Sequence, residues 1–208
     1  YRDNPFTQVV SGIKAIRKAP TLLLLFMNFT LVFIAADSVY EAFNQAIFTN
    51  AGVPVVMIGV LYAVAAVGGF IISQSVGWFT SQFSRKLLMG VTGGLAASGL
   101  FLSAMFGEML LVVIGAFFVL RLGQAIRDPI YSQLKNDLIP SNIRATTLSL
   151  ISVLDSAFDL LIFGLLAFFA FSGVSGILIA SSFVALIGTF IPLQAKQKRL
   201  VAVEKKGI

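Results

Sequence analysis

Six long apolar stretches divide this chain, and only short polar gaps separate them. Each stretch is close to the ~20 residues that an α-helix needs to cross the hydrocarbon core of a bilayer. The stretches cover residues 21–48, 54–80, 87–106, 109–130, 145–170 and 174–193. We therefore expect an all-α membrane protein with six transmembrane helices.

The composition excludes several other classes of protein. A chain that is 58% hydrophobic and 12% charged is not typical of a soluble domain. Its net charge of +6 is spread over several segments rather than interleaved with aromatic residues, which favours anionic lipid headgroups over nucleic acid as the partner. The absence of Cys and His excludes disulfides and the usual zinc sites. We expect no metal and no cofactor.

The distribution of basic residues predicts the orientation of the helices. The gaps after the second and fourth stretches and the two chain ends are basic, whereas the gaps after the first, third and fifth contain no Lys or Arg. By the positive-inside rule, both termini lie in the cytoplasm. The basic residues of the two gaps are Arg85, Lys86, Lys135 and Arg144.

Three segments follow from this pattern. Residues 1–19 are expected to be a cytoplasmic linker whose residues 4–18 form an amphipathic helix on the membrane surface. Residues 20–194 form the six-helix transmembrane part, and 195–208 form a basic cytoplasmic tail. Because the chain starts at Tyr1, we expect it to be a segment of a longer protein.

Small residues at a spacing of four predict close helix packing. Gly69, Ser73 and Gly77 share one face of the second stretch, and Gly90 and Gly94 share one face of the third. In lipid, such small residues let helix backbones approach each other closely.

Charged residues inside the apolar stretches are the candidate functional residues, because each costs at least ~2.5–3.5 kcal/mol to insert. Asp37 and Glu41 form one i,i+4 pair on a face shared with Thr30, Tyr40 and Asn44, and Asp155 and Asp159 form a second pair. A third stripe consists of Arg121, Gln124 and Asp128.

Estimated depth separates these candidates. At 1.5 Å per residue, Asp155 lies ~15 Å from the cytoplasmic end of its helix, near the midplane, and Asp37 lies ~25 Å from that end of its own helix. Arg121 falls ~18 Å below the outer start of its helix, in the inner half, where it can pair with Asp155. Glu41 is expected near the outer headgroups. Arg127 and Asp128 are expected with Lys135 and Asp137 at the inner boundary, in solvated ion pairs.

A carboxyl group at the midplane that faces a cavity can bind and release a proton as its exposure to water changes. It can also pair with a cationic substrate or a sodium ion. The residues alone leave these possibilities open.

Two gap sequences and one pair of residues resemble motifs of the major facilitator superfamily. The gap after the second stretch matches the family's G-x-x-x-[DE]-[RK]-x-G-[RK]-[RK] signature at Gly77, Arg85 and Lys86, and departs from it at Ser81, Gln82 and Ser84. The gap after the fourth stretch resembles D-x-x-P-x-x-x-R-[GA] at each defined position, with Asp137, Pro140, Arg144 and Ala145. Arg121 with Gln124 resembles the family's R-x-x-Q pattern.

This resemblance covers nearly the whole chain and implies half of a twelve-helix transporter. The six helices would be the C-terminal half, built from inverted three-helix repeats, and the substrate site would lie at the midplane between the two halves. The partner of this half would be the N-terminal six-helix half of the same protein, in the plasma or inner membrane. In this family the first and fourth helices line the cavity and the fifth flanks it, which places Asp37, Arg121 and Asp155 towards it.

The leading hypothesis is a proton-coupled secondary transporter that exports hydrophobic or cationic small molecules, and not an enzyme. In this hypothesis Asp155 takes up the proton, Arg121 adjusts the pKa of Asp155 and Asp37 contacts the substrate. Proton-coupled uptake of a metabolite such as a sugar or organic acid is the alternative. A channel is not favoured, because the sequence has no re-entrant loop signature. An aspartyl intramembrane protease would need its carboxylates at matched depth, whereas Asp37 and Asp155 differ by ~10 Å.

Overall fold

The computed structural model describes residues 20–139, 141 and 144–193, and this part of the chain is helical without strands. Six of its helical segments are long and apolar enough to cross a membrane, which is compatible with a multi-pass membrane protein. The predicted surface helix of residues 4–18, the basic tail and Pro140 lie outside the described residues.

The first span is one continuous helical segment of 31 residues, Pro20–Asn50. It consists of α2 (Pro20–Phe33), a π-helical turn η1 (Ile34–Ser38) and α3 (Val39–Asn50). In η1 the Val39 N–H donates to the Ile34 carbonyl. At 1.5 Å per residue the span is ~46 Å long, well beyond the ~30 Å hydrocarbon core. Asp37 lies inside η1, and π-helical turns are frequent at functional sites.

The other predicted spans are confirmed as helices, with two differences at their ends. The second apolar stretch is broken after Gln74 into two helices, and the fourth continues as a helix to Leu138, past Pro129. The helices are α4 (Val55–Gln74), α5 (Val76–Gln82), α6 (Arg85–Met105), α7 (Leu110–Leu138), α8 (Arg144–Ala167) and α9 (Gly173–Phe190), with a short turn η3 (Ala170–Ser172) before α9.

Two local features explain where these helices start and turn. Ser84 is the N-cap of α6, where its hydroxyl accepts from the Leu87 N–H at 3.2 Å. Gly52 has a φ of +80° in the tight turn between α3 and α4, a conformation that favours glycine.

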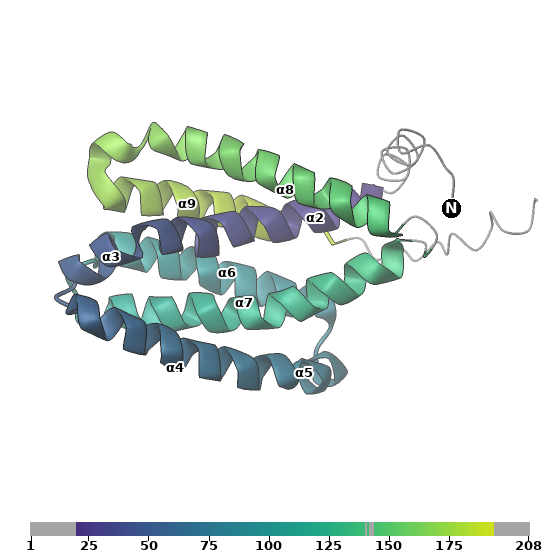
Figure 1. The fold of residues 1–208 in the computed structure, drawn as a ribbon, viewed down its shortest axis with the longest axis horizontal. Helices are drawn as coiled ribbons and strands as arrows, with labels where there is room; N and C mark the ends of the chain where they lie inside the picture. Colours follow the sequence, from purple (N-terminus) through teal and green to yellow (C-terminus); the bar gives the residue numbers. More distant parts are fainter. Residues whose placement is uncertain (1–19, 140, 142–143, 194–208) are drawn as a thin grey trace, which may run out of the picture.

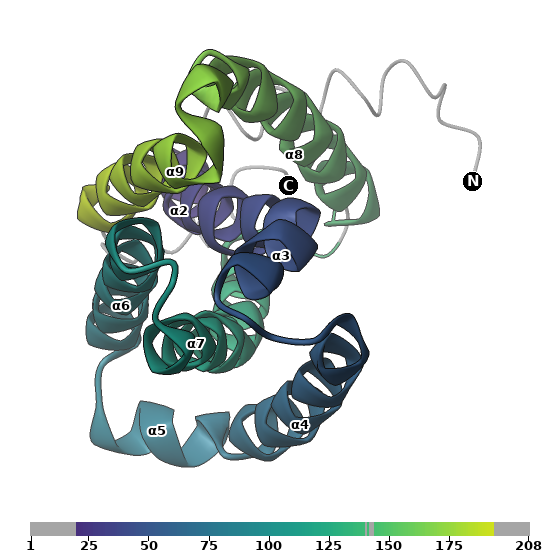
Figure 2. The same ribbon diagram turned by 90° about the vertical axis from the view of Figure 1, so that its left-hand side faces the viewer.

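The helices run up and down, so that the basic gaps meet at one end of the bundle (Figure 1). We call the end that carries Arg85, Lys86 and Arg144 the basic end. Figure 2 shows α2 and α3 near the centre, with α9, α6 and α7 along one side of them. The helices α4 and α8 flank this group on opposite sides. The main apolar core lies where the first span meets α6, α7 and α9, and it includes Val32, Phe48, Leu100 and Phe117.

Only some of the glycines selected from the sequence lie at helix contacts. A Cβ at Gly69 would lie 3.6 Å from the Ala125 Cβ of α7, as predicted for a packing position. At Gly77, Gly90 and Gly94 a Cβ would have no neighbouring atom within 4 Å, so the predicted packing role of these three is wrong. Gly93 is the tight position instead, because a Cβ there would lie 2.3 Å from Thr189 Oγ1.

Candidate functional site

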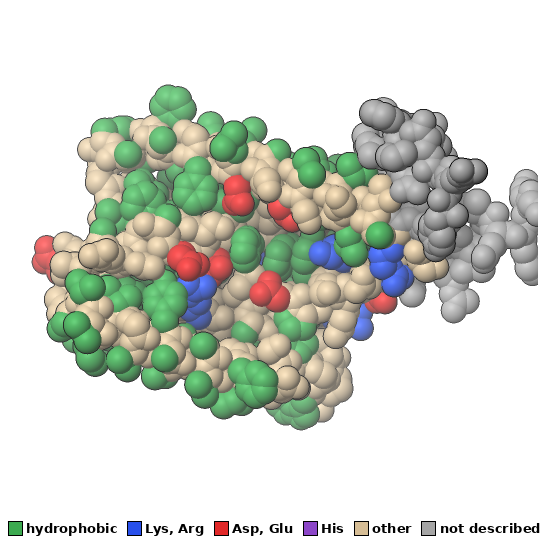
Figure 3. Space-filling view, viewed as in Figure 1, with side chains coloured by type: hydrophobic (Ala, Val, Ile, Leu, Met, Phe, Trp, Pro, Cys, Tyr) green, Lys and Arg blue, Asp and Glu red, His purple; other side chains and the backbone are tan. Residues whose placement is uncertain are grey.

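A band of charged side chains crosses the middle of one face of the bundle, between α8 and α4 (Figure 3). Carboxylates dominate this band, and basic groups lie beside them. The residues that form it come from the first span, α7 and α8, which are three of the helices long enough to cross a membrane. We call this surface the charged face; its members are Asp37, Glu41, Arg121, Asp128, Asp155 and Asp159.

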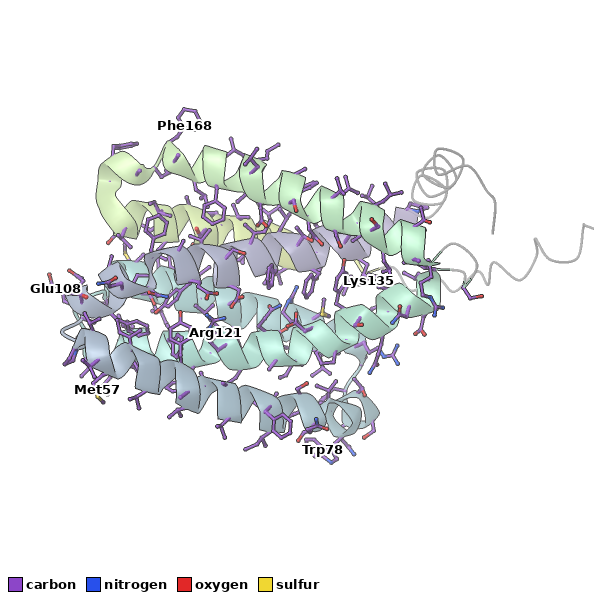
Figure 4. The ribbon with its side chains drawn as sticks, in the orientation of Figure 1. Met57, Trp78, Glu108, Arg121, Lys135 and Phe168 are labelled. Carbon is purple, nitrogen blue, oxygen red and sulfur yellow. The ribbon has the colours of Figure 1, made fainter. Side chains whose placement is uncertain are left out.

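Arg121 lies at the centre of the charged face, on α7 (Figure 4). Its Nη1 donates to Asp37 Oδ1 at 2.5 Å, and its Nη2 lies 3.3 Å from Glu41 Oε2. The side chains of Arg121 and Asp37 are 23% and 17% exposed, whereas that of Glu41 is 57% exposed. Asp37 is therefore the more buried partner of the arginine, and Glu41 is the more exposed one.

These contacts correct the expected pairing of Arg121 with Asp155. Because Arg121 contacts both Asp37 and Glu41, its predicted position well below Asp37 is wrong. The 31-residue first span is the reason: counting from Pro20 as if it stood at the hydrocarbon boundary moved Asp37 too far outward.

Tyr62 and Asn44 complete the surroundings of Arg121. The Arg121 guanidinium carbon lies 4.8 Å from the centre of the Tyr62 ring, and Asn44 Nδ2 donates to the Tyr62 hydroxyl at 2.9 Å. Asn44 was expected on this face of the first span, whereas Tyr62 was missed. It was nonetheless recognisable, because it is the single polar side chain between Val55 and Ile72.

Asp155 lies on the half-exposed side of α8 and bonds to the first span. Its Oδ1 accepts a hydrogen bond from Thr30 Oγ1 at 2.6 Å, and Thr30 is 1% exposed. Among the described residues, Asp159 Oδ1 is buried without a hydrogen-bond partner. Thr30 precedes Asp37 by seven residues, so Asp155 lies ~10 Å nearer the basic end than Asp37, as expected.

The remaining predicted residues of α7 and the first span divide between the charged face and the core. Gln124 is 8% exposed and donates to Asp128 Oδ1 at 2.5 Å, on the same face as Arg121. Tyr40 is 3% exposed, and its hydroxyl donates to the Val113 carbonyl at 3.4 Å. Tyr40 therefore lies in the core rather than on the charged face.

Arg127 was expected in a solvated ion pair, and this expectation is wrong. It is 1% exposed, and its guanidinium donates to the carbonyls of Met89 at 2.5 Å and Asn28 at 3.0 Å and to Asn28 Oδ1 at 3.1 Å. Asn28 in turn donates to the Ile191 carbonyl at 3.1 Å. Arg127 and Asn28 thus join α7 to α2, α6 and the end of α9. The sequence feature that could have indicated this buried site is Asn28, a polar residue inside the first apolar stretch.

The residues of the two loop motifs meet at the basic end. Arg85 at the start of α6 lies 3.2 Å from Asp137 Oδ2 near the end of α7, in an exposed ion pair. Arg144 at the start of α8 donates to the carbonyls of Asn136 and Ile139, both at 3.2 Å. Lys86 is exposed, and a Cβ added at Gly77 would have no neighbouring atom within 4 Å.

The charged face can bind a cation, exchange protons or hold an anion on Arg121. Of the described residues, no group of three or more acidic side chains is arranged to hold a metal ion. Comparisons of the chain with protein-family models, with curated proteins and with solved structures found no match.

Proposed function

We propose that this chain is the C-terminal six-helix half of a proton-coupled secondary transporter of the major facilitator type, which exports hydrophobic or cationic small molecules. The motif residues at 77–86, 121–124 and 137–145 support the family. The charged face supports transport.

The observation that carries this proposal is the position of the charged face. It lies between the two ends of helices that are long and apolar enough to cross a membrane. Contact with hydrocarbon would cost at least ~2.5–3.5 kcal/mol for each ionised group. This face therefore requires water or protein against it, as at a cavity shared with a second set of helices.

The excess of carboxylates on the face favours a cationic substrate. Arg121 neutralises Asp37 and, in part, the more exposed Glu41. Asp155 and Asp159 on α8 lack a basic partner in the described ion pairs and supply the negative potential that attracts a cation. In this mechanism Asp155 exchanges the proton, and Asp37 and Glu41 contact the substrate.

A second candidate function is proton-coupled uptake of an organic acid. The Nη2 of Arg121 contacts the carboxylate of Glu41, which is 57% exposed. A substrate carboxylate can replace Glu41 on this guanidinium, because arginine binds carboxylates with two donors in a fixed geometry.

The test is transport by the full-length protein in proteoliposomes under an imposed pH gradient. The probe is labelled tetraphenylphosphonium, and Asp155→Asn is compared with Glu108→Gln, which changes an exposed carboxylate outside the charged face. We expect at least a tenfold loss of gradient-driven flux for Asp155→Asn and wild-type flux for the control. Equal flux in Asp155→Asn and wild type would remove the proton role, and gradient-driven flux of labelled succinate in place of the cation would favour the second candidate.

A further inference from the structure

We propose that Tyr62 of α4 is a positioning residue that holds the Arg121 guanidinium against Asp37 and Glu41. Tyr62 touches the arginine rather than the carboxylates. It thereby makes the geometry of the charged face depend on where α4 lies.

Three contacts hold the Tyr62 ring in place. Its face lies 4.8 Å from the Arg121 guanidinium carbon, within the ~6 Å range of a cation–π contact. Its ring packs on Phe117 of α7 in a tilted arrangement, with ring centres 5.0 Å apart. Its hydroxyl accepts a hydrogen bond from Asn44 of α3 at 2.9 Å.

These contacts add a third point of attachment to the guanidinium. Asp37 and Glu41 contact its two Nη atoms, whereas its central carbon lies over the Tyr62 ring. A guanidinium held at these three points is restricted in orientation, since rotation breaks the contacts.

The sequence of α4 supports a specific role for this tyrosine. Between Val55 and Ile72 the other residues are apolar, and several of them, including Val56 and Phe70, are largely exposed. A phenylalanine would pack on Phe117 equally well. The hydroxyl accepts a hydrogen bond from Asn44 and the ring lies under the Arg121 guanidinium, so both parts of the tyrosine have a partner.

The consequence is that movement of α4 changes which carboxylates Arg121 pairs with. If α4 moves away from α7, the Tyr62 ring leaves the guanidinium and Arg121 can release Glu41, its more exposed partner. This last step rests on the proposed function, because it links the position of α4 to substrate binding.

The first experiment tests the positioning contact without any transport. Thermal unfolding of the full-length protein in detergent is measured for wild type, Tyr62→Leu, Arg121→Gln and the double variant. We expect the loss in unfolding midpoint caused by Tyr62→Leu to fall to less than half when Arg121 is already replaced. The matched control is Phe70→Leu, an aromatic change at an exposed position of α4, whose effect should add to that of Arg121→Gln. Additive effects for Tyr62 and Arg121 would overturn the proposal.

The second experiment measures binding of tetraphenylphosphonium by the same full-length variants at equilibrium. We expect Tyr62→Leu to raise the half-saturating concentration about tenfold, Tyr62→Phe to raise it less because the ring remains, and Phe70→Leu to leave it unchanged. A Tyr62→Leu variant that binds as wild type, although its unfolding is coupled to Arg121, would leave the contact intact and reject its link to substrate. Failure of the proposed function appears separately, as absence of binding in the wild type.

Discussion

Two arginines of α7 lie six residues apart and have opposite surroundings. Arg121 is partly exposed and contacts the carboxylates of Asp37 and Glu41. Arg127 is 1% exposed, and its partners are backbone carbonyls and the neutral side chains of Asn28 and Thr92. Six residues turn the helix by about 240°, so the two side chains leave α7 on different sides.

The difference separates a group suited to function from one suited to structure. The contacts of Arg121 are with ionisable groups on an open face, so a proton or a charged ligand can change them. The contacts of Arg127 are with carbonyls of α2 and α6 that stay neutral. A proton or ligand at the charged face therefore does not act directly on the partners of Arg127.

Replacing the two arginines by leucine provides the largest expected contrast. Arg127→Leu removes the donor from several buried acceptors at once, among them Asn28 Oδ1. We expect it to lower the free energy of unfolding by about 3 kcal/mol or more, against about 1–2 kcal/mol for Arg121→Leu. Denaturant unfolding in detergent micelles measures both. An equal cost at the two sites would contradict the division between them.

A methyl group added at Gly93 tests the packing around Arg127. The new Cβ would lie 2.3 Å from Thr189 Oγ1 and 3.1 Å from Arg127 Nη1. We expect Gly93→Ala to cost about 1–3 kcal/mol of stability. Gly94→Ala adds the same group in open space and should be neutral or stabilising by up to about 1 kcal/mol.

Removing the side chain that Gly93→Ala disturbs should restore part of the loss. We expect the double variant Gly93→Ala with Thr189→Ala to unfold at a higher temperature than Gly93→Ala alone. No recovery in the double variant would show that the strain lies elsewhere.

The ion pair at the basic end should have the smallest effect. Arg85 and Asp137 are 40% and 64% exposed, so water and salt screen their attraction. We expect Asp137→Asn to change the free energy of unfolding by about 0.5 kcal/mol or less at physiological ionic strength, as determined by denaturant titration. A loss as large as that of Arg121→Leu would mean that this pair is not a simple surface contact.

The helices were predictable from the sequence because apolar length alone decides whether a segment can cross a bilayer. The breaks were less predictable. The division after Gln74 falls in the polar run of residues 73–75, a signal of a break that the prediction missed, whereas no residue pattern marks the π-helical turn at Asp37.

The candidate site was predictable in its members but not in its pairing. Ionised groups in apolar stretches are visible in any sequence, so Asp37, Arg121 and Asp155 were found. Which of them meet depends on relative depth, and the depth estimate failed for the 31-residue first span. Arg127 was misplaced for a different reason: its partners include backbone carbonyls, which every residue has and no sequence marks.

The contacts of Arg127 also constrain how the protein is made. A span that carries Arg121, Arg127 and Asp128 is costly to insert alone, at ~2.5–3.5 kcal/mol for each charged group near its centre. The Asn28 and Met89 acceptors precede α7 in the chain, so they have already been synthesised when α7 leaves the ribosome. We therefore expect retention of α7 in a bilayer to depend on α2 and α6 remaining beside the site of insertion, an order of assembly that the contacts of Arg127 would impose.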